Sequence, residues 1–223
     1  MLAPRNIPDR PQVRDAQRTR SAILDSAERS FARNGLHGTR SEDIASDCGV
    51  TKAMIHYYFD TKENLYKAVL ERVFRERIDG MDFATIRKLE PVAALEAFVD
   101  RLMEQSARKP HLGPLFALEN IQNQGTYYTQ SGGTIYRVLT EIVQRGIKGG
   151  SFRETDARHA AINIMGACMH YFNITNNVRQ LWPSGRYSET ALLKGHAASA
   201  RSFIIDSLLK HRRPKRPRSD DRR

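Results

Sequence analysis

The sequence predicts an all-α protein, and three observations support this fold class. Apolar residues recur at intervals of three and four along most of the 223-residue chain, which is the period of an amphipathic helix. We find no convincing stretch of the strict alternation of apolar and polar residues that marks a half-buried strand. Glycines and prolines separate the helical stretches, and threonines stand at three of the expected helix starts.

The first helix is expected over residues 13–34. Ile23, Ala27 and Phe31 follow one another at intervals of four, so their side chains form one apolar stripe along the helix. Gly35 follows directly and can adopt the left-handed conformation that ends many helices.

Two short helices are expected next. Thr39 and Glu42 have the spacing of a capping box that opens the first of them, and Gly49 is placed to close it. Thr51 can cap the second short helix, which extends to about Tyr58.

Longer helices fill the rest of the chain. Thr61 can cap a helix over residues 62–79. After Gly80, glycine- and proline-containing stretches separate five further helices, expected over residues 91–107, 112–124, 133–149, 155–180 and 188–211.

The two short helices, joined at Gly49 and Val50 with the first helix behind them, form a helix-turn-helix. The second short helix of such a motif lies in the major groove of DNA. Ile55 and Phe59 are four residues apart, so both can face the protein core. The opposite face then displays Lys52, Ala53, His56 and Tyr57.

The displayed face has chemistry suited to DNA. Lys52 supplies positive charge, the tyrosine hydroxyl groups donate to phosphate oxygens, and Ala53 is small enough to approach base edges. Arg40 and Lys62 lie just inside helix N-termini, whose backbone N–H groups bind phosphates. Taken one at a time, these residues also fit plain structural roles, such as Tyr58 in the core. Their combination favours DNA binding.

Charge and cysteine content agree with this interpretation. The formal net charge is +11 and the pI is near 9.9, which favours a polyanionic partner. Cys48 and Cys168 are far apart and belong to no Cys/His cluster, so we expect neither a disulfide framework nor a metal site. A long apolar run and the apolar core of a signal peptide are both missing, so we expect a cytoplasmic protein without membrane contact.

The segment "GTRSEDIASDCGVTKAMIHYYFDTKENLYKAVLE" resembles the DNA-binding domain of TetR/AcrR-type transcriptional regulators, and the resemblance covers about Thr19 to Arg72. It implies a sequence-specific DNA-binding regulator, most often a repressor in such a family. Its DNA-contacting positions fall on Arg40, Thr51, Lys52, Ala53, His56, Tyr57, Tyr58 and Lys62. Ala53 stands where the family commonly has glycine and His56 where it usually has tyrosine. Both positions can therefore change the operator or its contacts.

The same resemblance implies a C-terminal helical ligand-binding and dimerisation domain. The partners would be a palindromic or near-palindromic double-stranded DNA operator, a small-molecule effector, and a second subunit joined through a four-helix bundle of the last two helices. The effector would shift the helix over residues 62–79 and change the spacing of the recognition helices. Candidate ligand-binding residues, which combine an apolar lining with a few polar groups, are Met103, Phe116, Asn120, Tyr127, Tyr128, Tyr136, Met169, His170 and Asn173. Each of them alone fits an ordinary core or dimer position better.

The expected organisation is a mobile basic arm (1–17), a helix-turn-helix domain (18–64), a regulatory and dimerisation domain (65–211) and a disordered basic tail (212–223). Two other functions remain open. One is a helical architectural or interaction protein that binds DNA without sequence preference and without a ligand. The other, a small helical enzyme, lacks HExxH, GxSxG and phosphate-loop motifs, so we expect no catalytic residue and no cofactor.

Overall fold

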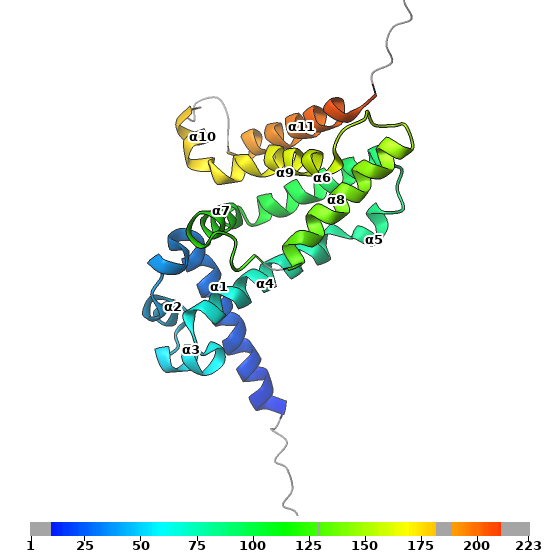
Figure 1. Ribbon diagram of the computed structural model, residues 1–223. Coiled ribbons are helices and arrows are strands. Elements are labelled where there is room, and N and C mark those ends of the chain that lie inside the picture. The colour runs from blue at the N-terminus through cyan, green and yellow to red at the C-terminus, as the bar shows by residue number, and fades with distance from the viewer. Residues whose placement is uncertain (1–9, 129, 182–188, 211–223) are drawn as a thin grey trace, which may run out of the picture.

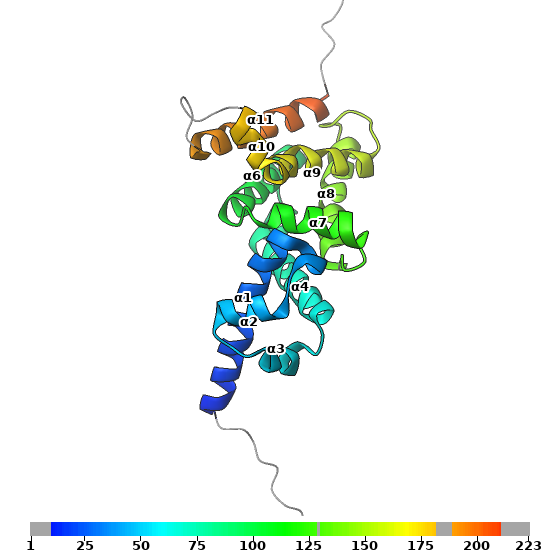
Figure 2. The same ribbon diagram turned by 90° about the vertical axis from the view of Figure 1, so that its left-hand side faces the viewer.

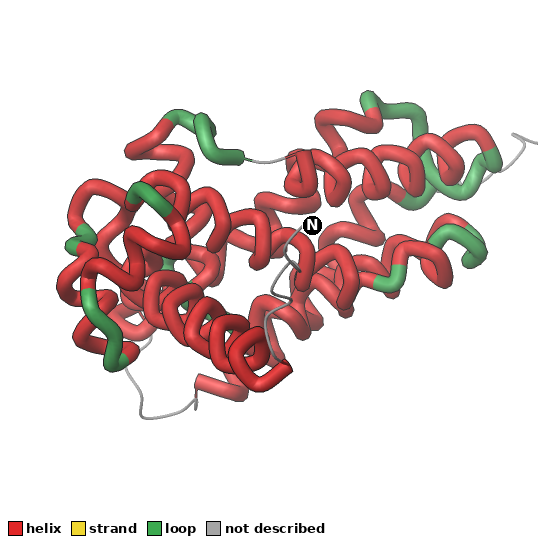
Figure 3. Tube along the Cα trace, turned by 90° about the horizontal axis from the view of Figure 1, so that it is seen from below, coloured by secondary structure: helices red, strands yellow, loops and turns green. Residues whose placement is uncertain are grey.

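The computed structural model describes residues 10–128, 130–181 and 189–210, and within these ranges the regular elements are helices (Figures 1 and 3). In chain order they are α1 (Arg10–Gly38), α2 (Ser41–Cys48), α3 (Lys52–Phe59), α4 (Lys62–Met81), α5 (Phe83–Ile86), α6 (Pro91–Arg108), α7 (Leu112–Asn123), α8 (Gln130–Lys148), α9 (Ala157–Asn173), α10 (Thr175–Leu181) and α11 (Glu189–Leu208). Figures 1 and 2 show α2 and α3 toward one end of the molecule and α9 and α11 at the other. The predicted all-α fold class is confirmed.

Several local signals of the sequence are confirmed. Thr51 caps α3, because its hydroxyl oxygen accepts the backbone N–H of Met54 at 3.2 Å. Thr61 caps α4 by accepting the N–H of Asn64 at 3.1 Å. Gly49 closes α2 in the left-handed conformation, with φ 70°. Gly49 and Thr51 therefore determine where α2 ends and α3 begins, and Thr61 determines where α4 begins.

The capping box predicted at Thr39 and Glu42 is wrong. The Thr39 hydroxyl donates to the carbonyl oxygen of Gly35 at 2.7 Å and lies 3.2 Å from that of Ser30. Arg40 is the N-cap of α2 and gives no side-chain capping bond. Thr39 therefore stabilises the end of α1, where Gly35 departs from the helical conformation with φ 69°.

Helix α1 begins at Arg10, earlier than the predicted start at residue 13, so residues 10–17 of the expected arm are helical. Pro11 is compatible with this earlier start. The N–H groups in the first turn of a helix have no intrahelical acceptor, so a proline there costs no hydrogen bond. Residues 1–9 of the expected arm and 212–223 of the expected tail lie outside the described residues.

The predicted helix over residues 155–180 is two helices, α9 and α10, which separate at Ile174. The Thr175 hydroxyl donates to the carbonyl oxygens of Tyr171 and Phe172 at 3.1 and 3.3 Å. Such local bonds compete with the regular helical pattern. The short helix α5 was not predicted from the sequence; Asp82 caps it by accepting the N–H of Thr85.

Two hydrophobic cores divide the described structure. One joins α1–α4 with Leu112 and Leu115 of α7, and the other joins the end of α4 with α5, α6, α8, α9 and α11. Helix α4 belongs to both, since Tyr66 is buried in the first core and Met81 in the second. A movement of α4 must therefore disturb both cores.

A buried carboxylate ties α1 to α4 and to the turn between α6 and α7. Glu28 is 4% exposed, and its carboxylate accepts from Arg72 at 2.7 Å and lies 2.8 Å from Nε2 of His111. Lys109 Nζ lies 3.4 Å away. Burial raises the pKa of Glu28, but the hydrogen bonds from His111 and Arg72 and the charge of Lys109 outweigh it and hold the pKa at about 2.

Replacing Glu28 by glutamine should lower the free energy of unfolding by about 3 kcal/mol at pH 7, the energy that separates a pKa of about 2 from the usual 4.5. Because the folded pKa is the lower one, the carboxylate stabilises the fold fully above pH 4.5 and loses this contribution as the pH falls toward 2. Urea denaturation of both proteins at several pH values measures this. Exposed Glu154→Gln is the control, with a change within about 0.5 kcal/mol. Equal stability of wild type and Glu28→Gln at pH 7 would contradict the role of Glu28.

Candidate functional site

Helix α3 is held to the protein by one face. Ile55 is 3% and Phe59 7% exposed, and both pack in the first core with Ile44 and Leu36. The guanidinium carbon of Arg20 lies 5.1 Å from the centre of the Phe59 ring and covers it from α1. The predicted orientation of α3, with Ile55 and Phe59 inward, is confirmed.

The other face of α3 is open to solvent. Lys52, Ala53, His56 and Tyr57 are exposed, and Tyr57 keeps 82% of its surface. The ring and hydroxyl of Tyr57 therefore contribute little to the core and are accessible to a partner. Tyr58 is half-buried and meets the Tyr57 ring edge-on, with the ring centres 5.2 Å apart. This contact holds the Tyr57 ring in place.

Two positive side chains of this region already have partners. Lys52 Nζ lies 2.6 Å from the Glu42 carboxylate, an exposed ion pair between α3 and α2. Lys62, the first residue of α4, donates to the carbonyl oxygen of Thr39 at 3.0 Å. Arg40 is exposed directly after Thr39. The start of α4 and the residue before α2 are therefore joined, and the side chains of Lys62 and Arg40 both lie near this junction.

His56 has a different neighbour. Its Nε2 lies 4.0 Å from the Asp60 carboxylate, and both side chains are more than 70% exposed. All eight residues predicted to contact DNA thus lie on α3, its Thr51 cap, the Arg40 N-cap of α2 or the start of α4.

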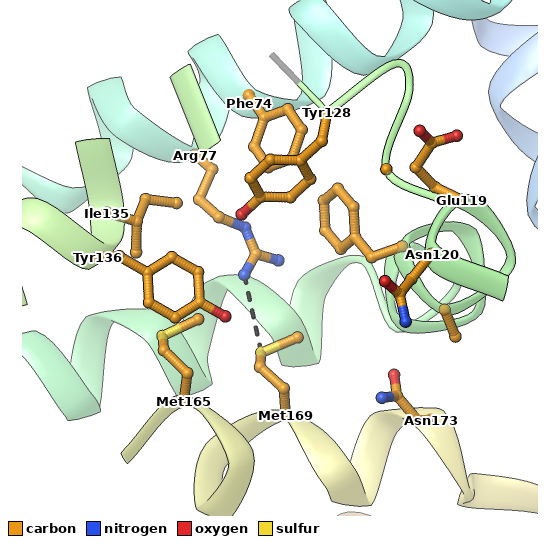
Figure 4. A pocket seen from close by; sticks show the side chains of 13 residues that line it. Phe74, Arg77, Glu119, Asn120, Tyr128, Ile135, Tyr136, Met165, Met169 and Asn173 are labelled. Atoms are coloured by element: carbon orange, nitrogen blue, oxygen red, sulfur yellow. Dashed lines mark hydrogen bonds between the residues drawn. The ribbon is translucent and has the colours of Figure 1, made fainter. Parts of the chain in front are cut away.

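A second feature is a partly open cavity of about 710 Å³, lined by residues of α4, α7, α8 and α9 and of the segment before α8 (Figure 4). Its lining residues are Phe74, Arg77, Phe116, Ala117, Glu119, Asn120, Gly125, Tyr128, Ile135, Tyr136, Met165, Met169 and Asn173. Aromatic and thioether groups dominate, with a few polar groups among them, as in small-molecule sites.

Six residues of the predicted ligand-binding set line this cavity, namely Phe116, Asn120, Tyr128, Tyr136, Met169 and Asn173. Three do not. Met103 is buried in the second core, and Tyr127 packs against Tyr66 with the ring centres 5.4 Å apart. His170 is exposed, because it follows Met169 on α9 and a helix turns by about 100° per residue.

Arg77 is the main lining residue that sequence reasoning missed. It is 5% exposed, and burial lowers its pKa to about 10, so it stays charged at neutral pH. The sequence did carry a signal: Val69, Val73 and Arg77 lie at intervals of four on α4, which places an arginine in line with an apolar stripe.

Glu119 also lines the cavity, but its carboxylate has partners within the protein. It accepts the side-chain N–H of Asn123 at 2.6 Å and the backbone N–H of Tyr127 at 2.7 Å. In Figure 4 the carboxylate points away from the middle of the lining residues. It therefore braces the segment after α7.

Two further findings concern the described residues. None of the helices there is long and apolar enough to cross a lipid bilayer. In those same ranges, histidine, cysteine and acidic side chains form no group of three or more that could hold a metal ion.

A helix-turn-helix with an exposed polar face on α3, joined to a helical domain with a ligand-sized cavity, defines a DNA-binding regulator. Residues 23–69 match the family model "Bacterial regulatory proteins, tetR family", and residues 91–204 match "Tetracyclin repressor-like, C-terminal domain". The chain belongs to the tetR family of bacterial regulatory proteins, and it is a DNA-binding transcriptional regulator.

Individual relatives agree. The HTH-type transcriptional regulator RutR of Escherichia coli is 30% identical over 172 residues, which cover 71% of this chain and 76% of RutR. The HTH-type transcriptional repressor NicS of Pseudomonas putida is 29% identical over 167 residues, 72% of this chain and 78% of NicS. The crystal structure of a HlyIIR mutant protein superposes with a TM-score of 0.66 at 26% identity, over 88% of this chain and all of that one.

Proposed function

We propose that this regulator is a repressor that binds a palindromic operator as a homodimer and leaves it when a small molecule enters the cavity. The observation that carries the proposal is that α4 begins beside the exposed face of α3 and continues into the wall of the cavity. We assign DNA binding to residues 18–64 and effector binding and dimerisation to residues 65–211, and we place the protein in the cytoplasm with the DNA.

On DNA, we assign α3 to the major groove. Ala53 and Lys52 would contact base edges there, with the ammonium group of Lys52 leaving Glu42 for an acceptor on guanine. Tyr57, Tyr58, Thr51 and His56 would contact phosphates on one side of the groove. Arg40 and Lys62 would contact the backbone through their charges and the nearby helix N-termini.

The effector acts through differential affinity. A ligand changes operator binding only by the difference in its own affinity for the two conformations of the dimer. The cavity wall includes Phe74 and Arg77 of α4, so a ligand that packs better against one position of α4 selects that position. The start of α4 is joined to the start of α2 through Lys62 and Thr39, so the helix-turn-helix follows.

For dimerisation we propose the exposed faces of α9 and α11, which lie side by side (Figure 1). Ile162 on α9 is 56% exposed and Phe203 on α11 is 67% exposed. Apolar side chains of this size on neighbouring helices are typical of a surface that a second subunit covers.

The DNA contacts can be tested on an operator selected from random DNA with the full-length chain. We expect a symmetric site, and Tyr57→Ala and Lys62→Ala should each weaken binding to it about tenfold, or about 1.4 kcal/mol. Lys62→Ala should also reduce the slope of log K against log salt by about one, since one phosphate contact is lost. Fluorescence anisotropy across a salt series measures both. Lys88→Ala, an exposed change after α5, is the control. Unchanged operator affinity in both variants would refute the assigned contacts.

The dimer surface can be tested with Phe203→Glu, which places a charge in the proposed contact. Light scattering after size exclusion should show a monomer, and operator affinity should fall because the two half-sites are no longer bound by one particle. Ile121→Glu on α7, where the isoleucine is 73% exposed, should remain a dimer. A dimeric Phe203→Glu protein would place the interface elsewhere.

A further inference from the structure

The guanidinium group of Arg77 is a buried cation without a strong partner. Its two hydrogen bonds among the described residues are long and go to weak or neutral acceptors: Met169 Sδ at 3.8 Å and Ser106 Oγ at 3.5 Å. A guanidinium has five N–H donors, and leaving them unsatisfied away from water is costly. These two long bonds leave most of the N–H donors of Arg77 available to an acceptor that enters the cavity.

Arg72, five residues earlier on the same helix, shows what a paired arginine in this protein is like. It lies 2.6 Å from the Asp25 carboxylate and 2.7 Å from that of Glu28. For Arg77, by contrast, no ion pair is found among the side chains that the structure describes. The nearby Glu119 is occupied by Asn123 and by the N–H of Tyr127.

Aromatic rings surround this cation. The guanidinium carbon lies 5.4 Å from the centre of the Phe116 ring, which itself stacks on Phe74 at 5.0 Å. Figure 4 shows the guanidinium group near Tyr128 and Tyr136, in the middle of the lining residues. Burial raises the pKa of Tyr128 to about 12 and also raises that of Tyr136, so both hydroxyls are neutral donors at pH 7. The cavity thus offers one positive charge, hydroxyl donors and apolar walls.

We infer that the effector is a small organic carboxylate whose anionic group binds Arg77 and whose aromatic or apolar body fills the cavity. A carboxylate accepts two parallel N–H bonds from a guanidinium, a geometry that an ammonium group cannot offer. The body of the ligand packs against Phe116, Tyr128 and Met169, and Asn120 and Asn173 can bind a second polar group. That the bound carboxylate acts as an effector rests on the proposed function. The binding of the carboxylate to Arg77 does not, and it can be measured without DNA.

The volume sets the size of the ligand. A cavity of about 710 Å³ falls within the range of roughly 300–1,000 Å³ that drug-sized molecules occupy. Bicyclic and biaryl carboxylates are therefore suitable probes, and each has a primary amide of almost the same shape without the charge.

The test measures binding of 2-naphthoate and 4-phenylbenzoate, and of their primary amides, to the full-length protein by calorimetry without DNA. We expect at least one carboxylate to bind at least tenfold more tightly than its amide. In Arg77→Met, which keeps the length of the side chain and removes the charge, this preference should disappear, while Arg77→Lys should keep part of it. Arg137→Met on α8, an exposed position, should behave as wild type. Circular dichroism confirms that each variant is folded.

Three results would overturn the inference: no carboxylate binding at millimolar concentration, equal affinity for acid and amide in the wild type, or an undiminished preference in a folded Arg77→Met protein. The wild-type comparison stands even if Arg77→Met does not fold. Failure of the proposed function has a different signature. In that case the carboxylate binds through Arg77, yet operator affinity is the same with and without it.

Discussion

The carboxylate of Glu28 is the interaction on which the joining of the two cores depends. It is buried on α1 and satisfied by Arg72 of α4 and by Lys109 and His111 before α7. A buried charge is tolerated only with such partners, and removal of one partner leaves the others in a low-dielectric setting. The network therefore helps to hold α4 against α1 and the turn before α7, and a movement of α4 relative to α1 must work against it.

Helix α4 connects the two functional features of the molecule. Lys62 at its start is bonded to Thr39 beside α2, and Arg77 lies in the cavity fifteen positions later, about 22 Å along the axis at about 1.5 Å per residue. A helix transmits a tilt over that length because its backbone is stiff. Under the proposal that an anion binds Arg77, the new contact would form between α4 and a ligand that also touches α7 and α9, so the ligand would act on the position of α4.

Much of the DNA-binding part could be predicted because its signals are local. Thr51, Thr61 and Gly49 act within a few residues, and the spacing of Ile55 and Phe59 determines which face of α3 is exposed. Thr39 misled the prediction, since its spacing to Glu42 fits a capping box while its hydroxyl bonds to Gly35. When a threonine hydroxyl has two possible partners, the tertiary structure decides which one it binds. The spacing of residues in the sequence does not reveal that choice.

The cavity was only partly predictable for a related reason. Residues such as Tyr136 and Asn173 are far apart in sequence, and nothing local brings them together; Met103 and His170 had suitable chemistry but face elsewhere. The break at Ile174, which separates α9 from α10, likewise depends on the bonds of the Thr175 side chain to the preceding turn. Arg77 carried a usable signal in its apolar stripe, because a charge in such a stripe needs a partner or a function.

The most direct test of coupling through α4 is a distance measurement between the two helix-turn-helix units of a dimer. Nitroxide labels at Ser46→Cys, an exposed position on α2, would be placed in a protein whose Cys48 and Cys168 are replaced by alanine. Pulsed electron paramagnetic resonance then gives the distance distribution with and without the tightest-binding carboxylate. We expect the distribution to shift by several ångströms in the wild-type background and to stay in place with Arg77→Met. Superimposable distributions with the carboxylate shown to be bound would contradict the coupling.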